Sequence, residues 1–313
     1  MADTLIPNAK FSDPHVTAKG ETRASVAWSG LKTLWFNTGT LCNITCANCY
    51  IESSPTNDRL VYLTRADVEP YLDELTQPAE IGITGGEPFL APEIIAIMQA
   101  ALERGHTLLV LTNAMRPMMR PRVQAGLADL AARYPGRMTL RVSLDSHDAA
   151  THDAERGQGA FAEACAGLKW IAAAGIPLAL AGRKALHEDE QAARDGYRAL
   201  IASLGLARAL DAADPKQLVL FPEMIARDDP PEITTACWGI LNKTPDSIMC
   251  ASQRMVVRRK GAASPRVLAC TLLVDDPAFD LGSTLAEATA QQVKLNHPWC
   301  ASFCVLGGAS CSA

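Results

Sequence analysis

The sequence predicts an α/β protein in which parallel strands form one sheet, open or closed into a barrel, with helices packed outside. Two observations support this. Segments with strand composition alternate with helical segments about six times between residues 31 and 221, at spacings that suit βαβ crossovers. The polar and glycine-rich motifs of the chain also directly follow predicted strands, which is where parallel α/β sheets bind their ligands.

The predicted strands are short and apolar, and the predicted helices carry apolar residues three or four positions apart. The strands are expected at residues 31–37, 81–84, 107–113, 138–145, 177–182 and 218–221. The helices are expected at residues 64–77, 92–105, 122–134, 160–175 and 188–205. Thr64 has the position of an N-cap, Pro92 stands at the start of its helix, and Gly105 and Gly175 end theirs.

The composition limits the classes of function. The chain has 313 residues, of which 48% are hydrophobic, and a net charge of −5. No long basic run is present, so we expect no nucleic-acid partner. The apolar runs are too short to span a bilayer, and the N-terminus lacks the pattern of a signal peptide. We therefore expect a cytoplasmic protein with no membrane partner.

The organisation along the chain predicts three parts. Residues 1–30 are polar and irregular and are expected to form an N-terminal extension, and residues 31–228 carry the strand–helix alternation. After a proline-bearing joint, residues 229–313 are expected to form a smaller second module. Its segment 255–270 is typical of a β-hairpin that turns across residues 261–265.

The ten cysteines are distributed unevenly. They are Cys42, Cys46, Cys49, Cys165, Cys237, Cys250, Cys270, Cys300, Cys304 and Cys311. A reducing cytoplasm does not favour a disulfide framework, so metal binding is the more natural use of so many thiols. Cys165 stands alone in an alanine-rich helical segment and is expected to be a buried small hydrophobic residue.

The first cysteine group, LCNITCANCYIES at residues 41–53, places three thiols within one short loop. Thiolates suit iron–sulfur clusters or zinc. Structural zinc prefers four protein ligands, and no fourth cysteine or histidine lies nearby in the sequence. A [4Fe–4S] cluster held by Cys42, Cys46 and Cys49 would leave one iron open to a substrate or cofactor. Structural zinc and incidental core cysteines are the alternatives.

CNITCANC has the CxxxCxxC pattern of the radical S-adenosylmethionine (radical SAM) superfamily, which this chain resembles over residues 31–225. Further motifs follow in the family's order. GGEP, formed by Gly85, Gly86, Glu87 and Pro88, resembles the motif whose backbone contacts the SAM amino group. Thr112-Asn113 resembles the family's TN pair, Ser143 and Asp145 in VSLDS resemble its residues for the SAM ribose and carboxylate, and HDAERGQGAF (152–161) resembles a stretch that follows strand four.

The resemblance implies a partial (β/α)6 barrel that holds a [4Fe–4S] cluster and SAM. The family usually has an aromatic residue just before the third cysteine and uses its backbone at the adenine edge. Asn48 occupies that position here, and Tyr50 follows the cysteine. The resemblance also places Arg183 near the SAM carboxylate, although a solvated surface arginine is the alternative.

The late cysteines indicate a second metal site. MVVRRKGAASPRVLAC resembles the hairpin of SPASM and twitch modules, and FDLGSTLAEA and CASFCVLGGASC resemble the segments that follow it. The resemblance implies a small cysteine-rich α+β module with one auxiliary [4Fe–4S] cluster. Its ligands would be Cys250, Cys270, Cys300 and either Cys304 or Cys311. A zinc-ribbon-like site that includes His297 is the alternative.

Together these features predict a radical SAM oxidoreductase. The resemblance implies that the reduced cluster cleaves SAM to a 5′-deoxyadenosyl radical, which abstracts hydrogen from a peptide or small-molecule substrate. It also implies a reductant such as flavodoxin or ferredoxin as a partner. Two other classes remain open from the sequence, a non-catalytic iron–sulfur electron carrier and a structural zinc protein.

Overall fold

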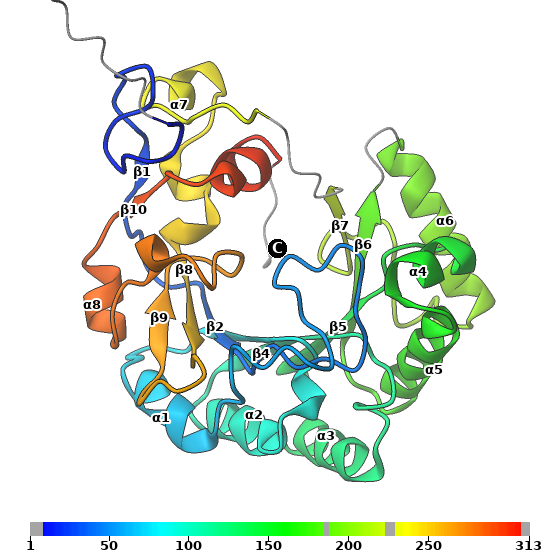
Figure 1. Cartoon of the computed structure of the whole chain (residues 1–313). Helices are drawn as coiled ribbons and strands as arrows, with labels where there is room; N and C mark the ends of the chain where they lie inside the picture. Colours follow the sequence, from blue (N-terminus) through cyan, green and yellow to red (C-terminus); the bar gives the residue numbers. More distant parts are fainter. Residues whose placement is uncertain (1–8, 185–187, 223–228, 308–313) are drawn as a thin grey trace, which may run out of the picture.

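The computed structural model describes residues 9–184, 188–222 and 229–307. An eight-stranded sheet in the order β7-β6-β5-β4-β3-β2-β8-β9 curves into an open barrel, and helices cover its outside (Figure 1). The strands are β2 (Thr33–Asn37), β3 (Glu80–Thr84), β4 (Thr107–Thr112), β5 (Met138–Ser143), β6 (Leu178–Lys184), β7 (Leu218–Pro222), β8 (Gln253–Val257) and β9 (Arg266–Leu268). All neighbours from β7 to β8 are parallel, which confirms the predicted partial barrel.

The helices that connect the strands are α1 (Arg65–Asp73), α2 (Ile94–Glu103), α3 (Pro121–Arg133), α4 (Ala149–Arg156), α5 (Ala160–Ala173) and α6 (Glu190–Ser203). Thr64 caps α1 in a capping box with Asp67, as its position predicted. Helix α2 begins at Ile94 rather than at Pro92, because a separate 3₁₀ turn, η1 (Pro88–Leu90), precedes it. Helix α4 was not predicted, since its single buried residue leaves no apolar periodicity to detect.

The predicted C-terminal hairpin forms as β8 and β9, but β8 also adds to the barrel sheet. It pairs in parallel with β2, with Gln253 opposite Thr33. Leu34 of β2, Val256 of β8, Phe279 and Phe303 belong to one hydrophobic cluster. Residues 229–307 therefore share a core with the barrel, and the division into domains at residue 228 stays a prediction.

Short elements complete the C-terminal part. They are α7 (Cys237–Ile240), η2 (Pro245–Ser247), η3 (Met249–Ala251), η4 (Pro277–Phe279), α8 (Leu285–Thr289), β10 (Val293–Lys294) and the π-helical turn η5 (Cys300–Val305). Strand β1 (Ser25–Val26), in the expected irregular extension, pairs antiparallel with β10. Arg23 is buried in an ion pair with Glu232, so the described part of the extension packs on the C-terminal part. In the described residues, no helix combines the length and apolarity needed to cross a bilayer.

Candidate active site

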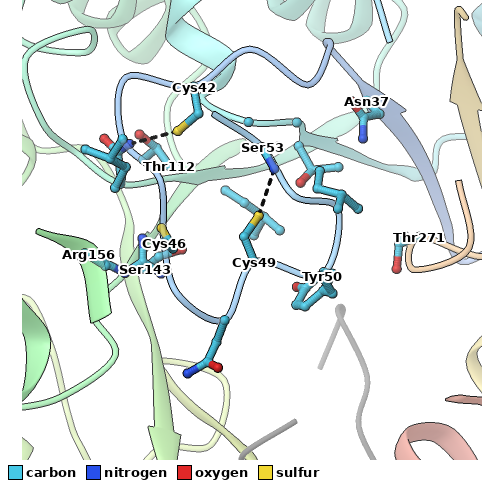
Figure 2. Close-up of a pocket in the computed structure, with 18 of the residues that line it drawn as sticks. Asn37, Cys42, Cys46, Cys49, Tyr50, Ser53, Thr112, Ser143, Arg156 and Thr271 are labelled. Atoms are coloured by element: carbon cyan, nitrogen blue, oxygen red, sulfur yellow. Dashed lines mark hydrogen bonds between the residues drawn. The ribbon is translucent and has the colours of Figure 1, made fainter. Parts of the chain in front are cut away.

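A cavity opens where the parallel strands β2 to β6 end, and it collects most of the predicted site residues. Its lining includes Cys42, Cys46, Asn48, Cys49, Tyr50, Gly85, Gly86, Asn113, Ser143 and Arg183. In Figure 2, the three thiols are spread along the loop, with Ser143 and Arg156 on one side and Asn37 and Thr271 on the other. Trp35, Asn37, Arg156 and Thr271 line it too and were not among the predicted site residues.

The cysteine loop is closed by its own backbone. Leu41 and Ser54 form a parallel bridge, and the Cys42 amide donates to the Ser54 carbonyl at 3.0 Å. Within the loop, the Ser53 amide donates to the Cys49 sulfur at 3.3 Å. All three thiols are free of disulfides. The loop thus presents three thiols to one cavity.

Burial controls the protonation of two of these thiols. It raises the pKa of Cys42 to about 12, and it also raises the pKa of Cys46. Both groups are therefore protonated at neutral pH when no metal is bound. Iron must displace these protons, so assembly of a metal centre here releases protons to solvent.

The glycine pair brings two backbone segments into contact. A methyl group added at Gly86 would lie 2.3 Å from the Leu41 carbonyl oxygen, and Gly85 has φ of +147°. The Gly86 amide donates to the Gly39 carbonyl at 2.8 Å. Only glycine permits this approach, so the pair keeps bare backbone at the cavity wall directly beside the cysteine loop.

Glu87 does not line the cavity, because its side chain is buried beneath it. Its carboxylate accepts hydrogen bonds from the Asn113 amide at 2.8 Å, the Thr112 hydroxyl at 2.9 Å and the Phe89 amide at 3.2 Å. Glu87 is thus a hydrogen-bond acceptor for the neighbouring segment and the N-cap of η1. It ties the ends of β3 and β4 together. Pro88 opens η1 and is also absent from the cavity lining.

Asn113 connects this assembly to the cysteine loop. Its side-chain amide donates to Asn43 Oδ1 at 2.9 Å, and the Cys42 sulfur lies 3.9 Å from the same nitrogen. Asn48, one residue before Cys49, donates to Glu155 Oε2 at 2.5 Å. The polar side chains around the thiols are therefore held in place by neighbours from β4 and α4.

Asp145 lies at an adjoining cavity that shares Tyr50, Ser143, Arg156 and Arg183 with the first one. Arg156 donates to both of its oxygens, from Nε at 2.7 Å and from Nη2 at 3.1 Å. Arg183 donates from Nε to Asp145 at 3.1 Å and from Nη2 to the Asn48 carbonyl at 3.2 Å. Asp145 was predicted to bind SAM, but it does not line the thiol cavity. It instead forms ion pairs with two arginines, Arg156 and Arg183, that do line it.

The charges of this group do not balance. Burial alone would raise the pKa of Asp145, but Arg156 and Arg183 outweigh it and hold that pKa below its usual value. Two guanidinium groups thus share one carboxylate, which leaves a net positive charge facing the cavity. Such a site favours an anionic group of a bound ligand.

The HDAERGQGAF stretch explains how Arg156 is positioned. Asp153 accepts hydrogen bonds from the Gly159 and Phe161 amides, each at 2.8 Å, and so fixes the corner between α4 and α5. The buried ring of His152 packs edge-on against Phe161, with centroids 5.7 Å apart. Arg156 occupies the last turn of α4. The signal for Arg156 was present in the recognised stretch, but its partner Asp145 was not evident from sequence.

The stability of this corner should depend on pH through His152. Burial first, and Arg156 second, lower the pKa of His152 to about 4. Unfolding returns that pKa to about 6.5, so the unfolded chain binds the proton first and stability is lost as pH falls from about 6.5 to about 4. We expect the loss from this residue to approach ~3 kcal/mol, measured by urea unfolding across that range. His152→Leu should flatten the slope, whereas replacement of the exposed His15 by Gln should leave it unchanged; equal slopes in His152→Leu and the parent would contradict this.

Three of the late cysteines approach one another in the C-terminal part. Cys250 lies in η3, Cys270 follows β9, and Cys300 begins η5, with Cys304 one turn later. Burial and then Cys270 raise the pKa of Cys250 to about 12, and burial, Cys270 and Cys250 raise that of Cys300. Cys311 lies outside the described residues. The ligand set with Cys250, Cys270, Cys300 and Cys304 or Cys311 stays a prediction.

Other C-terminal residues have structural contacts. His297 stacks edge-on between Phe279 and Trp299, and its Nδ1 accepts the Trp299 amide at 3.1 Å. The Cys237 sulfur accepts the Thr234 amide at 3.4 Å. In the described part of the chain, no group of three or more His, Cys, Asp or Glu side chains converges as around a single metal ion. A cubane cluster spreads its thiolates over separate irons, so it does not require that convergence.

The fold and the site together define a class of protein. It is an α/β protein with an open parallel barrel, in which three free thiols at the carboxyl ends of the strands could hold a metal centre beside a ligand cavity. Residues 36–188 match the family model of the Radical SAM superfamily. Over these residues, just under half of the chain, the protein carries a radical SAM domain, and proteins of that superfamily use a [4Fe–4S] cluster and SAM.

Curated relatives match over part of the chain. The subtilosin biosynthesis protein AlbA of Bacillus subtilis is 32% identical over 138 residues, which is 43% of this chain and 29% of AlbA. Mycofactocin maturase MftC of Mycobacterium ulcerans is 33% identical over 137 residues, 43% of this chain and 35% of MftC. The AdoMet-dependent heme synthase of Methanosarcina barkeri is 30% identical, over 44% of this chain and 38% of the synthase. The matches thus span well under half of these relatives.

Solved structures show the same fold at low identity. SuiB of Streptococcus suis bound to S-adenosylmethionine matches with a TM-score of 0.58 and 12% identity, over 90% of this chain and 68% of SuiB. anSMEcpe with bound AdoMet matches with a TM-score of 0.57 and 13% identity, over 90% of this chain and 81% of anSMEcpe.

Two observations of the cavity test the fit to the cluster and SAM. Three free thiols line it together, and a glycine pair with two arginines lines the space beside them. A soft donor set next to bare backbone and an excess of positive charge suits a cluster and an amino-acid-bearing cofactor. The residues present therefore fit both groups.

Proposed function

We propose that this protein is a radical SAM oxidoreductase that abstracts hydrogen from a peptide or small-molecule substrate. The observation that carries the proposal is the single cavity in which three thiols, the glycine pair and two arginines meet. Bound together, the cluster and SAM supply an electron transfer that cleaves SAM and yields a 5′-deoxyadenosyl radical.

The chain's own residues would bind and orient these groups. Cys42, Cys46 and Cys49 would hold the cluster, and the backbone of Gly85 and Gly86 would face the amino group of SAM. Arg156 and Arg183 attract the carboxylate, and their ion pairs with Asp145 fix the direction of both guanidinium groups. In this arrangement Asp145 positions ligand-binding residues.

Ser143, Asn113, Asn48 and Tyr50 complete the proposed SAM site. Ser143 lines both cavities at the end of β5, and Asn113 is held against the cysteine loop through Asn43. Tyr50 is 39% exposed and also lines both cavities. Its position between them suits a residue that separates the cofactor from solvent and contacts a substrate.

A peptide is the substrate class that we favour. Two of the curated relatives are named for the biosynthesis of a bacteriocin and the maturation of mycofactocin. One structure with the same fold holds a precursor peptide, SuiA. A small molecule is the second candidate, since a heme synthase is also among the relatives. A reductant of the flavodoxin or ferredoxin type would supply the electron.

We also propose one auxiliary [4Fe–4S] cluster in the C-terminal module, residues 229–313. Cys250, Cys270 and Cys300 would supply three ligands, and Cys304 or Cys311 the fourth. The support is that Cys250 and Cys300 are buried as free thiols and lie close enough to Cys270 for it to raise the pKa of both. Buried thiols of this kind gain favourable charge–charge contacts only when a metal centre removes their protons.

Anaerobic reconstitution tests the proposed activity. The protein is loaded with iron and sulfide, supplied with SAM and dithionite, and assayed for 5′-deoxyadenosine by chromatography. We expect a brown protein that forms 5′-deoxyadenosine. A brown protein that forms none would support an electron carrier, and a colourless protein that retains zinc would support a structural zinc site.

A further inference from the structure

Arg254 of β8 is a buried cation whose hydrogen-bond and stacking partners are neutral groups. It is 1% exposed. Its Nη1 donates to the Cys250 carbonyl at 2.7 Å and to the Gln253 carbonyl at 2.8 Å, and its Nε and Nη2 donate to the Ala288 carbonyl, each at 3.2 Å. Its guanidinium also stacks on Trp28, 4.3 Å from the ring centroid. Within the described ranges, no carboxylate forms an ion pair with it.

Two other arginines of low exposure have a different environment. Arg23 is buried and pairs with Glu232, and the largely buried Arg156 pairs with Asp145. A charge transferred from water into a protein interior is costly unless an opposite charge accompanies it. Carbonyl dipoles and an aromatic face compensate only part of that cost. The position therefore calls for an anion close to Arg254.

The three late thiols are the groups that would supply the anion. The carbonyl that accepts from Arg254 at 2.7 Å belongs to Cys250. Cys250 and Cys300 are buried in the same hydrophobic cluster, and Cys270 packs against that cluster. A metal centre replaces their protons, and the thiolates of such a centre carry more negative charge than its iron–sulfur core neutralises.

We propose that Arg254 is the countercharge of an anionic, thiolate-ligated iron–sulfur centre at Cys250, Cys270 and Cys300. The inference rests on the proposed auxiliary cluster. Arg254 is a positioning residue that touches the ligand-bearing segment and not the metal. Its fixed positive charge stabilises the loaded centre over the empty site. It also stabilises the reduced centre over the oxidised one, because the reduced form carries one more negative charge.

A purely structural role is the competing explanation. Arg254 joins η3, β8 and α8 through its carbonyl contacts, and this scaffolding would work with or without metal. The two roles differ in one measurable respect. Replacement of a scaffold residue lowers the stability of loaded and empty protein equally, whereas replacement of a countercharge lowers the stability of the loaded protein more.

The experiment uses the full chain with Cys42, Cys46 and Cys49 changed to Ala, so that the late cysteines are the remaining proposed cluster ligands. The protein is loaded anaerobically with ferrous iron and sulfide, and a portion is then stripped with a chelator. Arg254→Met removes the charge, and Arg254→Lys keeps it. Arg258→Met is the matched control. Arg258 lies in the same hairpin as Arg254 and forms a partly exposed ion pair with Asp67 of α1, which this change breaks.

Three readouts are followed: iron per chain, the rise in melting temperature on loading, and the midpoint potential of the centre. For Arg254→Met we expect at least a twofold loss of retained iron, a smaller rise in melting temperature and a more negative potential. Arg254→Lys should recover most of each, and Arg258→Met should leave all three unchanged. Should Arg254→Met fail to fold, Arg254→Gln, which keeps a donor without the charge, decides by the same readouts.

The outcomes separate the two proposals. If Arg254→Met lowers the melting temperatures of loaded and stripped protein equally and keeps both iron and potential, Arg254 is a scaffold residue and the auxiliary cluster stands. If the parent protein takes up no iron, the auxiliary cluster is absent and the inference on Arg254 falls with it.

Discussion

Cys46→Ala should abolish 5′-deoxyadenosine formation and remove about four irons per chain from the reconstituted protein. Three thiolates hold the four-iron cluster and leave one iron open for SAM, whereas two thiolates do not hold a stable cubane. Cys46 occupies the middle of a loop that is closed by backbone hydrogen bonds at residues 41, 42 and 54. The loop should therefore keep its fold when the thiol is lost. Iron analysis and chromatography of the reaction products check the result.

Cys165→Ala is the matched control for this change. Cys165 is also a free and buried cysteine, but it lies in α5, outside the thiol cavity. The Cys165→Ala variant should retain the iron content of the parent protein and should form 5′-deoxyadenosine as the parent does. Continued formation of 5′-deoxyadenosine by Cys46→Ala, at the rate of the Cys165→Ala variant, would refute the assignment of the first cysteine group as the SAM-binding cluster.

Arg156→Gln should cause the largest loss of stability among single changes at the cavity. Asp145 is buried and Arg156 largely so, with side-chain exposures of 7% and 11%, and they form a bidentate pair. Removal of one partner from a buried ion pair leaves the other charge poorly compensated. Because Arg183 still contacts Asp145, we expect a decrease in the free energy of unfolding of about 3 kcal/mol, at the lower end for such pairs. Urea unfolding measures this.

The same variant should bind SAM at least about tenfold more weakly, since one charge-assisted hydrogen bond to a carboxylate is lost. Calorimetry on reconstituted protein measures this affinity. Arg116→Gln, which breaks an ion pair with Glu163 at a guanidinium that is 86% exposed, should change neither quantity. A destabilised Arg156→Gln protein with unchanged SAM affinity would limit Arg156 to a structural role.

Several features could be derived from the sequence because they depend on local pattern. The alternation of strands and helices, the N-cap at Thr64 and the hairpin after residue 253 follow from periodicity and turn chemistry, and the structure has each of them. The site motifs were identified by their resemblance to a family, and most of them follow a predicted strand. Parallel strands place their carboxyl ends together, so motifs distant in sequence meet at one cavity.

Other features could not be derived because they depend on which residues become partners. Helix α4 has only one buried residue, His152, so its periodicity gave no signal. The carboxylate of Glu87 turns beneath the cavity to the end of β4, and Asp145 is engaged by Arg156 and Arg183. The roles of both residues at a SAM site stay predictions. In each case the sequence indicated a polar residue near the site, but it did not indicate the direction in which the side chain points.

The sequence by itself determined that this protein has a parallel α/β sheet and a three-thiol loop, since apolar periodicity and cysteine spacing are properties of neighbouring residues; the barrel was implied by the resemblance to a family. The tertiary structure alone decided that β8 lies beside β2, that Arg156 pairs with Asp145, and that Arg254 is buried among carbonyls next to Cys250. These contacts result from how the elements pack in three dimensions. Periodicity reports whether a residue is buried, but it does not report which distant group lies opposite it.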